Sequence, residues 1–224
     1  MSKQSPKSSL FEQFAIVAKA LGHANRLELL ELLAQGERSV EALANVAGLS
    51  IANTSRHLQH LRLAGLVVSR KEGLYVFYRI ASDDVIFLLG SLRRTSERHI
   101  GEVDRVIFGY FNERDTLEPV TRDELRKRSN SGLVTVLDVR PVEEYEFGHI
   151  PGAINMPVED IEKCIKDIPA GQEVIAYCRG PYCVLAFEAV AKLREKGFGA
   201  RRLEDGYPEW KAAGLPIELD REIR

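Results

Sequence analysis

The spacing of apolar residues changes part-way along this chain of 224 residues, and that change limits the folds it can adopt. In the first half, apolar side chains recur mostly at helical spacing, as in Leu10, Phe14 and Leu21. In the second half two short apolar runs, Val134–Val139 and Glu173–Tyr177, are typical of buried parallel strands, with helical segments between and after them. The chain is therefore predicted to fold as two different domains, with no internal repeat.

The predicted boundaries follow from the same pattern. Residues 1–111 are expected to form a mainly α domain. Residues 120–224, in which strands alternate with helices, are expected to form an α/β domain with a parallel sheet. The polar stretch 112–119 is the expected linker. The fold class is thus two domains, mainly α and then α/β.

Composition and the lengths of apolar runs narrow the class further. Hydrophobic residues make up 45% of the chain and charged residues 29%, which is typical of globular domains and excludes a disordered or collagen-like chain. The longest apolar run, Val85–Leu89, is far shorter than the ~20 residues that span a bilayer. No signal peptide is legible, and three cysteines, an odd number, favour a reducing compartment. We therefore expect a cytoplasmic protein with no membrane partner.

A local excess of positive charge lies in the first half. The net charge of −2 divides into +2 over residues 1–115 and −4 over residues 116–224. Within the first half, residues 53–79 hold five basic side chains and one acidic side chain. Such a basic stretch allows a protein of nearly neutral charge to bind phosphate. The first domain is therefore expected to bind nucleic acid.

A short helix, a tight turn, a second helix and a hairpin follow one another in this basic half. Ser39 is placed to cap the first of these helices, and after Gly48, Ser50 is placed to cap a second that runs to Ala64. β-type residues then surround Lys71-Glu72-Gly73, which predicts a hairpin. This order describes a winged helix-turn-helix, whose second helix presents a polar face to double-stranded DNA.

The polar face of that second helix carries most of the side chains expected to contact DNA. Asn and Arg are the side chains best shaped to read adenine and guanine, and basic residues at the hairpin tip are expected to contact phosphate. The expected contacts are Ser50, Asn53, Thr54, Arg56, His57 and His60 on the helix, and Arg70 and Lys71 at the tip. The alternative is a solvated helix in an all-α domain that has a hairpin.

Residues 15–81 resemble the ArsR-type winged-helix repressors, above all in the segment SRHLQHLRLAGLV. The resemblance implies a homodimer in which the first and last helices of the domain form the interface. The apolar stripe from Val85 to Tyr110 suits that role, because a helix with so much apolar surface must pack against another element. A dimer would place its two DNA-reading helices ~34 Å apart, which predicts a near-palindromic operator.

Many ArsR-type repressors bind metals, and in this respect the chain departs from the family pattern. The thiolate site of the family uses Cys-x-Cys on the third helix, but Ser39–Gly48 contains no cysteine. His99-Ile100-Gly101-Glu102 matches the second half of the other common site, whose first half would fall where Ile86 and Leu88 stand. Half a site cannot complete a tetrahedral shell. We therefore expect no metal site.

A cysteine at the end of a predicted strand is the main chemical feature of the second half. The segment EVIAYCRGPYCV ends a buried strand at Cys178 and begins a helix near Tyr182. A loop in this place can aim backbone N–H groups inward, and with the nearby Arg179 they would favour a thiolate. Gly180 lets the backbone turn, and Pro181 sets the entry to the helix. The alternative is a small apolar residue that ends a core strand.

Three segments in the second half, VLDVRPVEEYEFGHIPGAINMP, YCRGPYCV and LEDGYPEWKAAGLPI, resemble in order the signatures of rhodanese-type sulfurtransferase domains. The resemblance covers residues 118–219 and implies that Cys178 carries sulfur as a persulfide. It also implies that Asp138 and Arg140 support the wall of the active site. Related phosphatases need an arginine six places after the cysteine, where this chain has Val184, so phosphatase chemistry is not expected.

Cys183 stands five residues after Cys178, and two interpretations of it remain open. Either the loop brings the two sulfurs together, so that Cys183 resolves a persulfide or sulfenate at Cys178 into a disulfide, or Cys183 is a buried residue at the helix start that points away. Sequence alone does not give the separation of the two Cα atoms. Cys164 is expected to be a packing residue.

Together these patterns support a DNA-binding transcriptional regulator, expected to be a repressor, whose rhodanese-like domain senses a sulfane-sulfur donor or an oxidant at Cys178. The alternative is an active sulfurtransferase, using thiosulfate or polysulfide, in which the winged helix serves for dimerisation or docking. A third hypothesis is a metalloid sensor that uses Cys178 and Cys183 as soft ligands. None of the three requires a cofactor.

Overall fold

The computed structural model describes residues 5–112, 118–169 and 171–220, and it divides the chain into two compact units. The first comprises Met1–Leu89 and the second Gly90–Arg224, so that the division falls inside helix α5 (Asp83–His99). The linker expected at 112–119 stays a prediction, because its residues 113–117 lie outside the described part.

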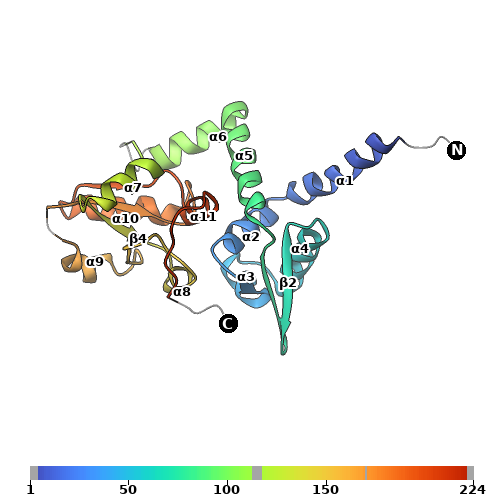
Figure 1. Ribbon diagram of the computed structural model, residues 1–224, viewed down its shortest axis with the longest axis horizontal. Coiled ribbons are helices and arrows are strands. Elements are labelled where there is room, and N and C mark those ends of the chain that lie inside the picture. Colours follow the sequence, from blue (N-terminus) through green and yellow to red (C-terminus); the bar gives the residue numbers. More distant parts are fainter. Residues whose placement is uncertain (1–4, 113–117, 170, 221–224) are drawn as a thin grey trace. The chain divides into compact units, whose positions relative to one another are not determined.

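The described residues of the first unit form four helices and a small sheet, followed by the start of α5 (Figure 1). The predicted caps are confirmed: the Ser39 hydroxyl accepts from the N–H of Ala42 at 3.2 Å, and the Ser50 hydroxyl accepts from the N–H of Asn53 at 3.3 Å. The elements are α1 (Pro6–Leu21), α2 (Ala24–Ala34), β1 (Arg38–Ser39), α3 (Val40–Val46), α4 (Ile51–Leu63), β2 (Val67–Glu72) and β3 (Tyr75–Ile80).

The hairpin β2–β3 forms the wing. Its strands pair antiparallel with Glu72 opposite Tyr75, and β1 adds to β3 to give the order β1-β3-β2. Gly73 adopts φ +58° in the turn, a conformation that costs glycine little. The core below the sheet is formed by leucines of α2, α3 and α4, among them Leu30, Leu43 and Leu58, all fully buried.

One prediction about the end of this half is wrong. The apolar stripe from Val85 to Tyr110 was expected on one long helix, but the structure breaks it at Ile100, whose backbone is extended (φ −114°, ψ 99°). Gly101, a weak helix former, follows directly. Two further helical segments come after α5: α6 (Gly101–Val106) and a π-helix, η1 (Ile107–Asn112).

The second unit contains a four-stranded parallel sheet with the order β5-β4-β6-β7. Of its strands, β4 and β6 match the two predicted apolar runs, whereas β5 and β7 were not predicted because they have only two and three residues. The elements are α7 (Arg122–Asn130), β4 (Val134–Asp138), α8 (Val142–Glu146), β5 (Ile154–Asn155), α9 (Ile161–Cys164), η2 (Ile165–Asp167), β6 (Glu173–Tyr177), α10 (Val184–Glu195), β7 (Ala200–Arg202) and α11 (Tyr207–Ala212).

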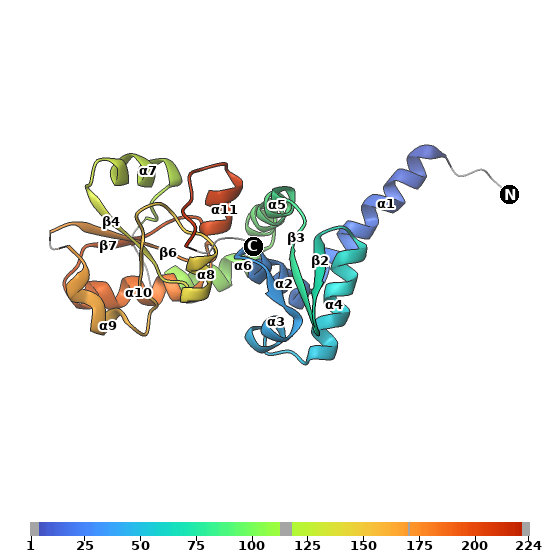
Figure 2. The same cartoon turned by 60° about the horizontal axis from the view of Figure 1, so that its bottom comes forward.

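Helices cover both faces of this sheet (Figure 2). On one face, α9 and α10 contribute Ile161, Val190 and Leu193 to a core with Val174. On the other face, Leu125 of α7 and residues of α11 form a second core. Such a three-layer arrangement places the loops that follow β4 and β6 at the carboxyl edge of the sheet, where parallel α/β folds bind ligands. Among the described residues, no helix is long and apolar enough to cross a membrane.

Candidate functional site

The loop between β6 and α10 holds both cysteines that the sequence singled out. Cys178 follows the last residue of β6, and Cys183 is the N-cap residue of α10. Both side chains are buried, and the structure joins them in a disulfide whose Cα atoms lie 6.1 Å apart, within the usual range for such a bond. Of the two interpretations left open for Cys183, this geometry agrees with the one in which the sulfurs meet.

The backbone of this cysteine loop is held from two sides. The N–H of Tyr207 donates to the carbonyl of Cys178 at 3.1 Å, and the N–H of Cys183 donates to the carbonyl of Gly180 at 3.2 Å. A Cβ atom at Gly206 would overlap the backbone of Arg179 and Gly180. The Cys183 N–H is thus engaged within the loop, and the predicted cradle of amides around the Cys178 sulfur stays a prediction.

Arg179 makes the most extensive side-chain contact of the loop. Its Nε lies 3.1 Å from Oε1 and 3.0 Å from Oε2 of Glu144, and its Nη2 lies 2.8 Å from Oε1. Glu144 belongs to α8 and is only 1% exposed, so this is a buried, two-point ion pair. No sequence pattern pointed to Glu144, because it stands 35 positions away among other acidic residues.

Asp138 and Arg140, which the resemblance places in the wall of the active site, form an ion pair at the end of β4. Both are fully buried, and the Asp138 carboxylate accepts from the backbone N–H and from the guanidinium of Arg140. Burial by itself lowers the pKa of the Arg140 guanidinium, but the charge of Asp138 outweighs it and raises that pKa. Arg140 also donates to the carbonyl of Gly148 at 2.7 Å and lies 4.3 Å over the Tyr207 ring. Arg140 therefore stays charged and is held in place by these contacts.

Tyr182 links the loop to helix α5 within the second unit. Its hydroxyl donates to Oε1 of Glu97 at 2.7 Å. Partial burial, followed by the hydrogen bond to Glu97, raises the pKa of the Tyr182 hydroxyl. The phenol therefore stays protonated at neutral pH and remains a donor. Pro181, one residue earlier, accepts a long contact of 3.5 Å from Arg202.

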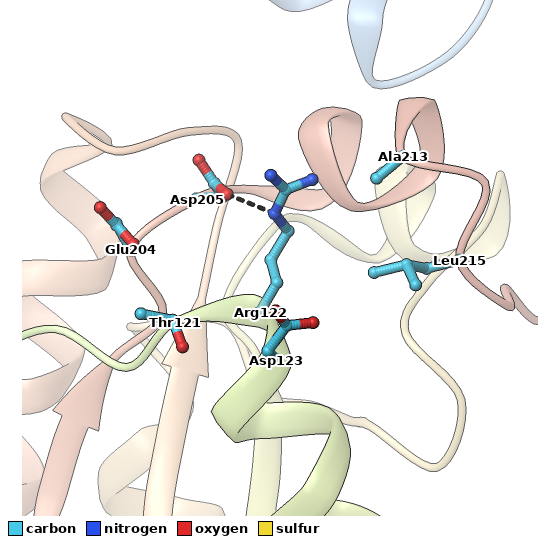
Figure 3. A pocket seen from close by; sticks show the side chains of 7 residues that line it. All are labelled: Thr121, Arg122, Asp123, Glu204, Asp205, Ala213 and Leu215. Atoms are coloured by element: carbon cyan, nitrogen blue, oxygen red, sulfur yellow. Dashed lines mark ion pairs between the residues drawn. The ribbon is translucent and has the colours of Figure 1, made fainter.

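A cavity elsewhere in the second unit is not part of the cysteine site (Figure 3). It measures about 350 Å³ and contains an ion pair of 2.7 Å between Arg122 and Asp205. Asp123 and Glu204 add further negative charge to its lining. Neither Cys178 nor Cys183 lines this cavity.

Helix α4 exposes part of the predicted DNA-contacting set. Asn53, Arg56 and His60 are exposed on one side, and Ser50 is exposed at the N-cap. The Arg56 guanidinium donates to Oδ1 of Asn53 at 3.1 Å, which orients both groups. Gln59, which was not among the predicted contacts, is exposed as well, and glutamine can read adenine.

Two residues of the predicted DNA-contacting set have buried side chains. Thr54 is fully buried and His57 is 6% exposed, so neither side chain is on the surface of the unit. The ring of His57 lies 4.5 Å from that of His23, and its pKa is lowered by burial and by the neighbouring His23. The buried arc of α4 runs through Thr54, His57, Leu58 and Leu61, at helical spacing. The prediction that Thr54 and His57 face DNA is therefore wrong.

The position and the pairing of Arg70 also differ from what the sequence predicts. It lies on β2 rather than at the hairpin tip, and its guanidinium pairs with Glu72 and with Glu37, the latter at 2.7 Å. These two carboxylates raise the pKa of Arg70 and offset its charge. Lys71, the next residue, is exposed on the same strand, and the tip itself presents Leu74, which is 95% exposed.

Comparisons with known proteins identify both halves. Residues 21–70 match the family model of a helix-turn-helix domain, and residues 121–213 match that of a rhodanese-like domain. The chain is 42% identical over 212 residues to the HTH-type transcriptional regulator Rv0324 of Mycobacterium tuberculosis, an alignment that spans 95% of this chain and 93% of that protein. The chain belongs to this family of ArsR-type winged helix-turn-helix regulators with a rhodanese-like domain.

Other relatives match one half each. A sulfurtransferase of Allochromatium vinosum is 33% identical over 85 residues, covering 38% of this chain and 78% of that protein. A solved homodimeric winged helix-turn-helix DNA-binding domain, fragment 1–100 of Mb0332 from Mycobacterium bovis, is 44% identical with a TM-score of 0.41, and the match covers 45% of this chain and 94% of that one. The chain is thus a transcriptional regulator with helix-turn-helix and rhodanese-like domains.

The close approach at Gly206 gives a test of how the cysteine loop of this regulator is held. We expect Gly206→Ala to lower the free energy of unfolding of the second unit by about 1–3 kcal/mol, since its Cβ forces the loop backbone to move. Trp210 is the one tryptophan of the sequence, so its fluorescence during urea unfolding reports on this unit. Gly199→Ala is the control, because nothing lies within 4 Å of its Cβ position. Equal losses in the two variants would contradict this account of the loop.

Proposed function

We propose that this regulator senses reactive sulfur species or oxidants through Cys178 and Cys183, and that the thiol and disulfide states of the pair differ in affinity for DNA. The observation that carries the proposal is the disulfide between the two cysteines that enclose the loop. A resolving cysteine at this distance makes the modification of Cys178 reversible by thiols.

Sulfane sulfur supplies a balanced route to that disulfide. The Cys178 thiolate attacks the outer sulfur of a persulfide R–S–SH, the S–S bond breaks, and RS⁻ leaves, which forms Cys178–S–SH. The Cys183 thiolate then attacks the Cys178 Sγ and releases HS⁻. Two thiols are oxidised to one disulfide, and the sulfane sulfur is reduced to sulfide.

Peroxide reaches the same end point. The Cys178 thiolate attacks one peroxide oxygen, hydroxide leaves, and a sulfenic acid forms. Cys183 then displaces its hydroxyl group, so that peroxide is reduced to water. Both routes require that Cys178 reacts first, as its place at the carboxyl end of β6 suggests.

Sulfurtransferase activity is the second candidate function, and the rhodanese-like domain favours it. Turnover needs an external acceptor that takes sulfur from the Cys178 persulfide before Cys183 does. The pairing of the two cysteines works against such turnover, because the disulfide removes the nucleophile. Sensing is therefore the function that this loop supports better.

The proposed DNA-bound form is a homodimer on a near-palindromic operator. Helix α1 exposes large apolar side chains that its own unit does not cover, with Leu10, Phe11 and Phe14 between 57% and 62% exposed. Phe87 on α5 is also more than half exposed. Exposed apolar surface of this extent marks a protein interface, and a second copy of the chain supplies the matching surface.

Tyr182 connects the cysteine loop to helix α5, so that a change in the loop can affect other parts of the regulator. It lies between the two cysteines and donates to Glu97 near the end of α5, which is one continuous helix from Asp83 onward. A disulfide restricts the loop, whereas two thiols release it, so the Tyr182–Glu97 hydrogen bond has a different stability in the two states.

The proposed dimer predicts that Phe14→Glu produces monomers at concentrations where the wild type is dimeric, because a buried charge without a partner is costly in an interface. Sedimentation velocity measures the change. Leu74→Glu is the control, since Leu74 is exposed at the wing tip. If Phe14→Glu sediments as the wild type does, α1 is not the interface.

The proposed reading helix predicts that Arg56→Ala weakens DNA binding by about 1–3 kcal/mol, if Arg56 contacts guanine. Fluorescence anisotropy at fixed salt measures it, with a duplex selected by the wild-type protein from a random-sequence library. Arg105→Ala is the control, because Arg105 is another exposed cation, on α6, that pairs with Glu102. Equal losses of affinity in both variants would mean that Arg56 contributes only its positive charge and does not read a base.

The sensing proposal predicts that polysulfide treatment changes the Kd for this duplex about tenfold, a common size for such coupling. Cys183→Ser is expected to retain a persulfide at Cys178, seen by mass spectrometry, and to lose the response. Tyr182→Phe is expected to form the disulfide normally with a smaller response. Equal Kd values for the reduced and treated wild type would overturn sensing, and steady cyanide-dependent sulfur transfer in that protein would favour the sulfurtransferase.

A further inference from the structure

The positive charge next to Cys178 is balanced by one negative charge. Arg179 is the cation adjacent to the reactive sulfur in sequence, and Glu144 grips it through both carboxylate oxygens. The Arg179 side chain is 20% exposed and that of Glu144 is 1% exposed. This buried carboxylate holds the Arg179 guanidinium and offsets its charge, and it also lies close enough to Arg140 to raise the pKa of that guanidinium.

Other charged groups around the loop are balanced in the same way. Arg140 in the wall is paired with the equally buried Asp138. Arg202 reaches the carbonyl of Pro181, and Glu97 accepts from Tyr182, so these two contribute one charge of each sign. The described groups that contact the loop or its wall thus leave almost no net charge beside the two sulfurs.

This balance matters because sulfane donors differ in charge. Thiosulfate carries two negative charges to a thiolate that already carries one, so its approach requires a cation whose charge is not cancelled. A persulfide R–S–SH with an uncharged R group carries at most one negative charge. A loop without net positive charge therefore penalises thiosulfate much more than a persulfide.

We infer that Glu144 determines the donor class of Cys178: by neutralising Arg179, it selects persulfides of low charge over dianionic thiosulfate. The inference rests on the proposed function and adds the substrate class to it. In the favoured reaction Cys178–S⁻ and R–S–SH give Cys178–S–SH and RS⁻. In the disfavoured reaction Cys178–S⁻ and thiosulfate give Cys178–S–S⁻ and sulfite, so atoms and charge balance in both.

Three charge variants separate this role from simple packing. Glu144→Gln removes the negative charge and keeps the shape, which leaves the loop with the charge of Arg179. Arg179→Gln has the opposite effect, and the double variant restores neutrality with two amides. Each is made with Cys183→Ser in the full-length chain, so that the persulfide at Cys178 accumulates instead of becoming a disulfide.

The measurement is the rate of formation of the Cys178 persulfide, followed by peptide mass spectrometry with thiosulfate and with 2-hydroxyethyl persulfide. We expect the ratio of the thiosulfate rate to the persulfide rate to rise about tenfold in Glu144→Gln, to fall in Arg179→Gln, and to return to the parent value in the double variant. The rise is expected to shrink at high salt. Cys164, the free cysteine of the described chain, is the internal control, and its ratio should not change.

The outcomes are distinguishable. A parent protein that reacts with thiosulfate as fast as with the persulfide overturns the inference, and so does a double variant that keeps the altered ratio of Glu144→Gln. If Glu144→Gln does not fold, Arg179→Gln and the double variant decide the matter, since an unchanged ratio in Arg179→Gln also overturns it. If neither donor modifies Cys178 in the parent protein, the proposed sensing of sulfane sulfur itself fails.

Discussion

The buried ion pair between Asp138 and Arg140 holds together the edge of the sheet on which the chemistry depends. Arg140 reaches the carbonyl of Gly148 and lies over the ring of Tyr207, and Tyr207 in turn donates its N–H to the carbonyl of Cys178. One fixed charge pair thus connects the end of β4, the following turn, the start of α11 and the cysteine loop. Removing one partner of such a pair leaves the other charged and buried, at a cost of about 3–5 kcal/mol.

The same edge combines fixed charges with an apolar surrounding for sulfur. Cys178 and Cys183 belong to the core between the sheet and α10, together with Ala186 and Val190. Burial favours the neutral thiol, whereas the start of a helix of 12 residues favours the thiolate. Because the arginines nearby are paired with carboxylates, they add little to the second effect.

Sequence patterns predicted the structural features that depend on neighbouring residues. They failed for features that depend on contacts between residues far apart in the chain. Serine caps and two buried strands were found because each is a local signal, as at Ser39 and Ser50. The buried face of α4 was misplaced, because Thr54 and His57 were assigned to the polar face although both side chains are buried. The disulfide and the partner of Arg179 depend on loop closure and on α8, which no local pattern encodes.

The exposed face of α4 bears on how DNA binding by the proposed dimer depends on geometry. Arg56 and Asn53 orient each other by a hydrogen bond, and Arg70 on the wing is neutralised by two carboxylates. Arg62, Lys71 and Arg79 stay exposed, so the unit keeps basic side chains for contacts with phosphate. In the proposed dimer, affinity also depends on whether both reading helices meet the major groove at the spacing of one helical turn. In the proposed sensing mechanism, a change transmitted along α5 from the cysteine loop would alter that spacing.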